Sequence, residues 1–202
     1  MKARPILFST PMVLALLEGR KTQTRRIIKP QPIVKENNWQ FYPKSPFSRA
    51  GVNIPLNISD MSPYGKVGDL LWVRETASFW IKDGKPEKIM NYRADYIPNI
   101  EEINAPRWEK QEWRPSIHMP RWASRLTLEI TAVRVERLLD ITQRDAVAEG
   151  IKPLQGNAIR GFCDLWKSIN GESSWATNPW VWVIEFKVHH ENVDSLTTLS
   201  ER

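Results

Sequence analysis

Alternating apolar and polar positions predict several β-strands in this chain. One strand is expected over 70–75, with Leu71 and Val73 on one face and Leu70, Trp72 and Arg74 on the other. A second, over 125–138, alternates as far as Ala132, where the apolar phase changes as it does at a β-bulge. A third, over 179–188, is apolar on both faces, which is typical of the interior of a sheet.

Helical spacing and end signals predict three short helices. The first begins with Thr10 as its N-cap and ends at Gly19. The second, over 142–150, opens with the pattern of a capping box, and the third covers about 157–168. Short helices mixed with strands make the expected fold class α+β.

Two long segments between these elements have the composition of loops. Six prolines between 29 and 64 exclude a regular helix there, and interleaved aromatic residues suggest a covering loop, since disordered segments are poor in aromatics. A hairpin with an Asp83-Gly84 turn is expected over 79–94. In the following segment, 95–124, tryptophans alternate with arginines and lysines.

Most of the ten tryptophans are expected to be packing groups, because tryptophan is buried more often than displayed. Trp113 and Trp122 are the candidates for exposure, since each lies beside Arg or Pro in a segment without clear periodicity. Stacking of a nucleic-acid base on Trp122 is therefore a hypothesis based on the surrounding positive charge.

Composition narrows the class of protein further. The 202 residues suit one domain with insertions, and a net charge of +6 favours an anionic partner such as nucleic acid. There is neither a run of eighteen apolar residues nor a signal-peptide pattern, so we expect no membrane partner and a cytoplasmic location. Cys163 stands alone and is expected in the core, and the spacing of three histidines and one cysteine predicts no metal site.

The most informative segment is the basic stretch that follows the first predicted helix, from Gly19 to Arg26. Thr22, Thr24 and Arg26 recur at period two, so a strand would present them on one face. Basic residues on a strand are often no more than a solvated face. A lysine amine and a threonine hydroxyl that converge from a turn and a strand would instead form a binding or reacting loop.

This stretch resembles the signature of the ASCH domain family, Gly-Arg-Lys-Thr-x-Thr-x-Arg, which is matched here from Gly19 to Arg26. Gly68-Asp69 before a strand, the strand over 125–138 and the segment 183–186 follow in the family's order. The resemblance is closest to long ASCH proteins of the phage and prophage type. It implies a PUA-like small mixed β-barrel flanked by short helices, spanning 1–188 with insertions at about 30–66 and 95–124. Residues 189–202 are then expected to be a flexible tail.

The resemblance also implies an activity. A small bacterial family member is an amidohydrolase that removes the acetyl group from N4-acetylcytidine, and its catalytic residues correspond to Lys21, Thr24 and Glu149 of this chain. Thr24 would attack the amide carbonyl while a neutral Lys21 takes its proton and Glu149 orients the amine or relays protons. Because a free lysine has a pKa near ~10.4, burial or neighbouring cations must lower the pKa of Lys21 for this role.

The remaining candidates bind substrate or nucleic acid, and the expected partner is RNA or a modified nucleoside, without cofactor or metal. These candidates are Arg20, Thr22, Arg25, Arg26, Glu75 and Trp122. Glu75 and Glu185 are rivals of Glu149 as the functional carboxylate, although each would also suit a strand-end salt bridge.

Two other functions stay open. The first is an RNA-binding module without chemistry, which the positive charge and the PUA-like resemblance favour. The second is ribonuclease activity, for which Lys21 and the arginines would have to stabilise phosphate charge without an evident histidine pair.

Overall fold

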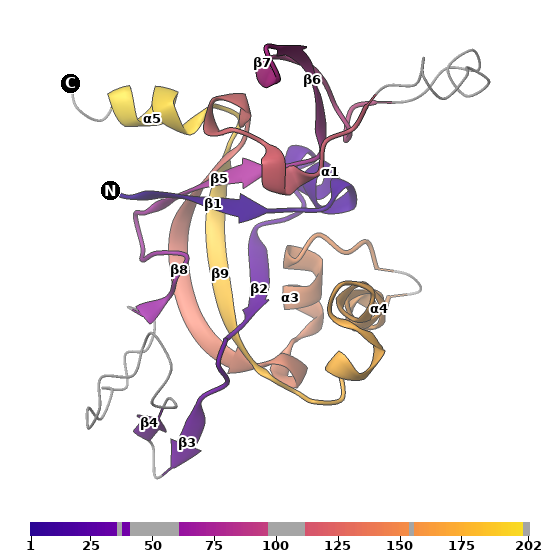
Figure 1. Cartoon of the computed structure of the whole chain (residues 1–202). Helices are drawn as coiled ribbons and strands as arrows, with labels where there is room; N and C mark the ends of the chain where they lie inside the picture. The colour runs from indigo at the N-terminus through magenta and orange to yellow at the C-terminus, as the bar shows by residue number, and fades with distance from the viewer. Residues whose placement is uncertain (36–37, 41–60, 97–111, 154–155, 200–202) are drawn as a thin grey trace.

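In the computed structural model, which describes residues 1–35, 38–40, 61–96, 112–153 and 156–199, the centre of the molecule is a five-stranded mixed sheet (Figure 1). Its strands, in spatial order, are β1 (Ala3–Leu7), β5 (Leu70–Arg74), β8 (Thr127–Arg137), β9 (Trp180–His189) and β2 (Gln23–Ile27). Only β1 and β5 are parallel, and the other neighbours are antiparallel.

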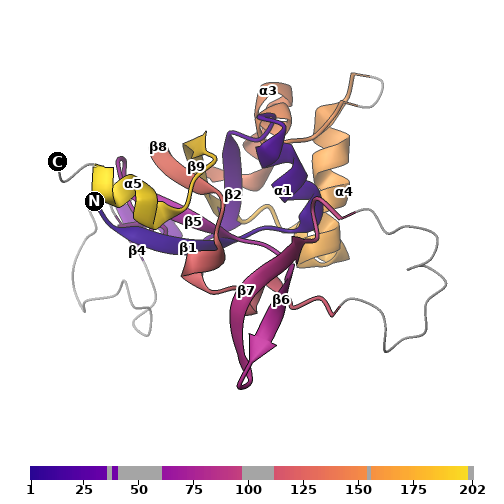
Figure 2. The same ribbon diagram turned by 90° about the horizontal axis from the view of Figure 1, so that it is seen from above.

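Two small antiparallel pairs lie outside this sheet. One joins β3 (Ile33–Lys35) to β4 (Asn38–Gln40), and the other joins β6 (Ala77–Lys82) to β7 (Lys85–Tyr92). The β6–β7 hairpin projects from the body of the molecule in both views (Figures 1 and 2).

The helices are short and lie around the sheet. They are α1 (Thr10–Leu17), α3 (Gln143–Ala148), α4 (Ala158–Asn170) and α5 (Val193–Leu199), with 3-10 turns η3 (Ser116–His118), η4 (Arg121–Ala123), η5 (Leu138–Asp140) and η6 (Glu172–Ser174). None of the described helices is long and apolar enough to cross a membrane.

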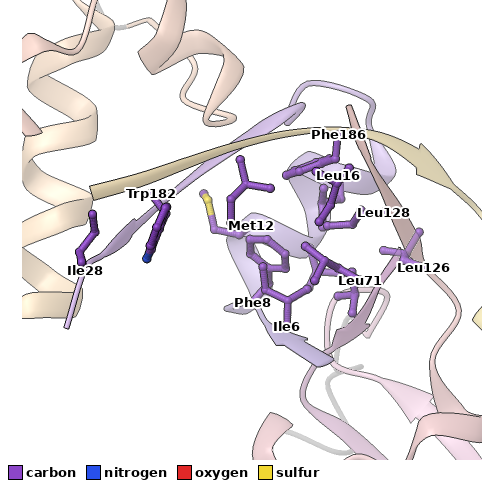
Figure 3. Packing of buried hydrophobic residues seen from close by; sticks show 14 residues of the cluster. Ile6, Phe8, Met12, Leu16, Ile28, Leu71, Leu126, Leu128, Trp182 and Phe186 are labelled. Carbon is purple, nitrogen blue, oxygen red and sulfur yellow. The ribbon is translucent and has the colours of Figure 1, made fainter. Parts of the chain in front are cut away.

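The strand pattern explains where the core forms. The main apolar cluster joins α1 to one face of the sheet, and Leu71, Trp182 and Phe186 point into it (Figure 3). Val181 and Val183, on the opposite face of β9, pack with the buried faces of α3 and α4. β9 is apolar on both faces because each face carries a layer, so the prediction of an interior strand is confirmed.

Several local predictions are confirmed by the structure. The register of β8 against β9 shifts between Ile130 and Ala132, which is the predicted bulge. Thr142 and Asp145 exchange both hydrogen bonds of a capping box at the start of α3. The first helix differs by one residue, because Ser9 and not Thr10 occupies the N-cap position.

Other expectations about the architecture are met only in part. The fold class α+β is confirmed, but β1 and β2 end the sheet and no described pairing joins them into a closed barrel. Most of the two expected insertions lies outside the described residues, at 41–60 and 97–111. The segment expected to be a flexible tail contains α5, whose first residue, Val193, is buried against Leu70 and Trp72. The domain boundary itself stays a prediction.

Candidate active site

Backbone pairing brings the basic motif and the end of α3 together. Gly19 has a positive φ of 69° and ends α1, after which the amides of Arg20 and Lys21 both donate to the carbonyl of Ala15. Lys21 then forms an isolated antiparallel bridge with Glu149. Two residues 128 positions apart in the chain are therefore held side by side before their side chains interact.

The side chains of Lys21 and Glu149 form a buried ion pair. The Lys21 Nζ lies 2.9 Å from the Glu149 Oε2, and each residue is only 2% exposed. The Nζ also donates to the backbone carbonyls of Gln23 and Glu149, each at 2.8 Å. Three acceptors match the three N–H groups of an ammonium, so the charged form of Lys21 is fully satisfied.

Burial acts against that charge. Desolvation lowers the pKa of Lys21 from its ordinary value, and the nearby cations Arg25 and Arg26 lower it further, while Glu149 opposes the shift. The sequence prediction that burial and arginines would lower this pKa agrees in direction, with burial as the larger cause. The site thus favours a lysine that gives up its proton more readily than a free one.

Gly150 allows this close approach. Its φ is +94°, and a Cβ added there would lie 2.8 Å from the Cβ of Ala15 and 3.1 Å from the Cβ of Lys21. A side chain at this position would push against the helix and against the stem of the lysine at once. The turn after Glu149 is therefore specific for glycine for both conformational and steric reasons.

A network of charges fixes the other oxygen of Glu149. The Arg25 Nη1 lies 3.3 Å from the Glu149 Oε1, and the Nη2 lies 2.9 Å from Glu136 and 3.4 Å from Asp145. The Arg25 side chain has no exposed surface. Arg134 extends the network through ion pairs with Glu136, Asp145 and Glu185.

Lys21, Arg25 and Glu149 line a cavity of about 540 Å³, a size in the range of small-molecule sites. Thr24 lines the same cavity, is 2% exposed and makes no side-chain hydrogen bond to any described residue. Its hydroxyl is thus available to a ligand. The site brings together all three residues predicted as catalytic, Lys21, Thr24 and Glu149.

Aromatic rings line the cavity beside the charged groups. The ring of Phe8 lies under two cations, with the Lys21 Nζ 5.5 Å and the Arg26 Cζ 5.0 Å from its centre. Tyr64 lines the same cavity, and burial raises the pKa of its hydroxyl, so it stays a neutral donor. Burial also lowers the pKa of Arg26, which donates to the carbonyl of Leu7.

The predicted binding residues divide into two groups. Arg25 and Arg26 line the cavity, whereas Arg20 bonds to the carbonyl of Gly150 and to Glu18 outside it. Thr22 is exposed and lies outside the lining. Its backbone N–H donates to the carbonyl of Ala148 at the end of α3. Arg20 thus stabilises the turn from outside the cavity.

Glu75 lies in a separate cluster, and Trp122 stands apart from the cavity. Glu75 is 2% exposed, but Arg125 holds both of its oxygens at 2.8 and 3.0 Å. Trp122 is exposed and packs edge-on against Phe79 at the base of the hairpin. The rival carboxylate Glu185 is half-exposed and pairs with Arg134.

The sequence did not indicate the contribution of α4. Phe162 and Trp166 are buried, yet both also line the cavity together with Leu165, Ile169 and Asn170. Helical periodicity cannot distinguish a face that packs on protein from one that borders a cavity. Cys163, on the same helix, is half-buried rather than in the core.

Lys29 and Ser116 also line the cavity, and neither was predicted. Within the described ranges, no group of three or more His, Cys, Asp or Glu side chains could hold a metal ion. His189 pairs with Glu129 at 2.9 Å, and neither His118, His189 nor His190 lines the cavity.

Comparison of the chain with protein-family models, with curated proteins and with solved structures found no match.

Proposed function

We propose that this chain is an amidohydrolase that removes the acyl group from an N4-acylated cytidine. The observation that carries the proposal is the buried Lys21–Glu149 pair, 2.9 Å apart, which lines the same cavity as Thr24, whose hydroxyl bonds to none of the described residues. The turn before β2 thus carries the base, Lys21, and β2 carries the nucleophile, Thr24. The carboxylate, Glu149, comes from the end of α3, far away in the sequence.

The proposed reaction begins with attack of the Thr24 hydroxyl on the carbonyl carbon of the amide. The bond from the carbonyl carbon to N4 then breaks, the acyl group remains on Thr24 as an ester, and cytidine leaves. A water molecule hydrolyses the ester, which releases the carboxylic acid and restores the threonine. The guanidinium of Arg26, which lines the cavity, can donate its N–H groups to the negative charge that develops on the carbonyl oxygen.

Lys21 takes the hydroxyl proton in its neutral form and returns it to the leaving amine. A neutral amine keeps only two N–H groups, so it can retain the two backbone carbonyls of Gln23 and Glu149 as acceptors. To accept the proton of Thr24, the amine has to turn its lone pair towards the Thr24 hydroxyl, so it gives up one of the three contacts seen in this structure. The contact with the Glu149 carboxylate is the one that loss of the positive charge weakens most.

The cavity also suits a nucleobase. Phe8, Tyr64 and Trp166 offer aromatic surface, and Asn170 and Ser116 offer polar groups to the edge of a ring. Lys29 lies exposed in the lining and is a candidate contact for a phosphate or a ribose hydroxyl.

We also propose that the fold belongs to the ASCH type, with a PUA-like barrel. The Gly19–Arg26 motif runs from the end of α1 into β2, as the family's motif does after its first helix. A bulge between Ile130 and Ala132 interrupts β8. Bulges bend strands, and such bends help a sheet to curve towards a closed barrel.

The test is the release of acetate and cytidine from N4-acetylcytidine by the purified protein, followed by chromatography. We expect turnover in the wild type, and its loss in Lys21→Met, Thr24→Val and Glu149→Gln, each of which keeps the approximate volume of the side chain. Thr24→Ser should keep part of the activity because it keeps the nucleophile.

Thr131→Val is the matched control, since Thr131 is an exposed strand threonine that does not line the cavity. Circular dichroism and thermal unfolding would show that every variant is folded. Absence of turnover in the folded wild type, or full activity in Thr24→Val, would contradict the proposal.

The second candidate function is RNA binding without chemistry, which Arg26 and Lys29 in the lining favour. Binding to phosphates should weaken steeply with added salt, whereas hydrolysis of a neutral nucleoside should hardly respond.

Ribonuclease activity has less support, because no histidine lines the cavity to act as acid or base.

A further inference from the structure

The β6–β7 hairpin has two chemically different faces. Phe79 pairs with Ile89 and Ala77 pairs with Tyr92, and cross-strand partners share a face of a two-stranded sheet. This face is apolar and packs on Met119 of the loop between η3 and η4. Its burial holds the hairpin on the body of the protein.

The opposite face presents one tryptophan among lysines. Alternation along β6 places Trp80 and Lys82 on the face that Phe79 avoids. Their partners across the strand pair, Lys88 and Lys85, share this face because the register shifts between Trp80 and Ile81. Trp80 is 60% exposed, the larger of the two exposed tryptophan fractions in the described part of the chain. The three lysines are also exposed.

Little on the hairpin neutralises this charge. Glu87 lies 3.7 Å from Lys82, but both are largely exposed, and such a surface pair contributes little. Asp83 lies in the turn at the tip with a positive φ of 50°. Among the described residues, neither a ring nor a cation stacks on Trp80.

We propose that this face, formed by Trp80, Lys82, Lys85 and Lys88, binds single-stranded nucleic acid. An exposed ring flanked by cations matches a chain of stacking bases joined by phosphates, and it needs no particular sequence. The hairpin projects from the body of the molecule (Figure 2), and Trp80 and the three lysines on this face are exposed. A neutral protein partner would have to desolvate the three ammonium groups without compensation.

The inference is independent of the proposed chemistry, because none of the four residues lines the cavity. An RNA strand held on the hairpin would nevertheless keep its nucleotides near the protein that carries the cavity, which raises their effective concentration. Failure of the deacylation assay would leave the hairpin site standing, and failure of the hairpin site would leave deacylation standing.

The test uses the full chain and two fluorescein-labelled probes, a twelve-residue oligouridine and a twelve-residue oligothymidine, with fluorescence anisotropy as the readout. We expect Trp80→Ala to weaken binding about tenfold, and Trp80→Phe to restore most of the affinity because it restores a ring. For the variant with Lys82, Lys85 and Lys88 all changed to Gln, the slope of log affinity against log salt should become shallower by about 2.

Matched controls separate this site from general attraction to a basic protein. Leu139→Ala removes an exposed apolar side chain elsewhere, and changing Lys66, Lys152 and Lys187 to Gln removes three exposed charges outside the hairpin. Equal losses in the two lysine variants, or unchanged affinity in Trp80→Ala, would overturn the inference. Binding to anionic phosphatidylserine vesicles with none to either oligonucleotide would overturn it as well. Preference for one oligonucleotide over the other would support it and identify the natural polymer.

Discussion

Glu149 and Glu75 are both 2% exposed, and each is paired with a cation, yet they lie in very different surroundings. Both oxygens of Glu75 accept from one edge of the Arg125 guanidinium, its Nε and Nη2, and Asp95 accepts from the next edge. The Cζ of Arg125 also lies 3.9 Å from the centre of the Tyr92 ring. Glu75 does not line the cavity.

Glu149 divides its two oxygens between Lys21 and Arg25, and both cations border open volume. The comparison shows that a buried ion pair alone does not mark a reactive site. Two features distinguish the Glu149 pair from the Glu75 cluster: access to a cavity, and a threonine in the same lining, Thr24, whose hydroxyl has no partner within the described part of the chain.

The largest expected effect is on catalysis. Lys21→Met should lower kcat/KM for N4-acetylcytidine by about 10³-fold, in the range measured for loss of a general base, while Glu75→Gln leaves kcat/KM unchanged in the folded fraction. Steady-state kinetics on the two variants, with Lys66→Met as an exposed lysine control, would measure the difference. A loss in Glu75→Gln as large as that in Lys21→Met would reverse the roles of the two carboxylates.

The next effect is on stability and should appear at the other cluster. Arg125→Met leaves Glu75 buried without its partner, so we expect the free energy of unfolding to fall by about 2 kcal/mol, less than for a fully buried pair because Arg125 is 23% exposed. Urea unfolding would measure the loss. Arg121→Met, which removes an exposed ion pair with Asp194, is the control and should change stability by less than about 1 kcal/mol. Equal losses would show that the Glu75 cluster stabilises the fold no more than a surface pair does.

The sequence predicted the strands and helices well because their patterns are local. The bulge of β8, the capping box of Thr142 and the interior position of β9 all depend on residues close together in the chain. The three catalytic candidates came from a family resemblance, not from periodicity.

What the sequence could not predict depends on long-range packing. Residues of α4 and β2 line the cavity together, and the apolar stripe of α4 has the same spacing whether it meets protein or open volume. Whether Glu75 or Glu149 meets Lys21 is likewise decided by the bridge between Lys21 and the end of α3, a contact across 128 residues.

Gly150 offers a way to disturb the Lys21–Glu149 pair without removing either charged side chain. Gly150→Ala adds a Cβ where φ is +94° and where Ala15 and Lys21 are already close, so we expect a loss of about 1–3 kcal/mol in the free energy of unfolding. Because the strain acts on Lys21, kcat/KM should fall too. Gly84→Ala, in the turn of the hairpin, shares the positive φ but meets no atom within 4 Å, and it should lose stability without losing activity. Equal activity in the two variants would show that the approach of Gly150 to Lys21 is not needed for the reaction.

The smallest effect concerns pH, where the two sites should have opposite signs. Burial lowers the pKa of Lys21, so the folded protein binds fewer protons than the unfolded chain between the lowered pKa and the ordinary 10.5, and stability rises with pH in that window. Burial raises the pKa of Glu75, so the folded protein binds more protons between the ordinary 4.5 and the raised pKa, and stability falls as pH rises there. Each slope is at most about 1.4 kcal/mol per pH unit.

Unfolding curves at several pH values would isolate each slope by difference. The free energy of unfolding of the wild type minus that of Lys21→Met should grow with pH in the alkaline window. The same difference for Glu75→Gln should shrink as pH rises above 4.5. Activity should also rise as Lys21 loses its proton, with a midpoint below 10.5. Since Glu75 lies outside the cavity, the pH profile of kcat/KM in Glu75→Gln should match that of the wild type. A shifted profile in this variant, with the Lys21 slope intact, would show that the two carboxylates are coupled through the sheet and that the separation of the two sites is incomplete.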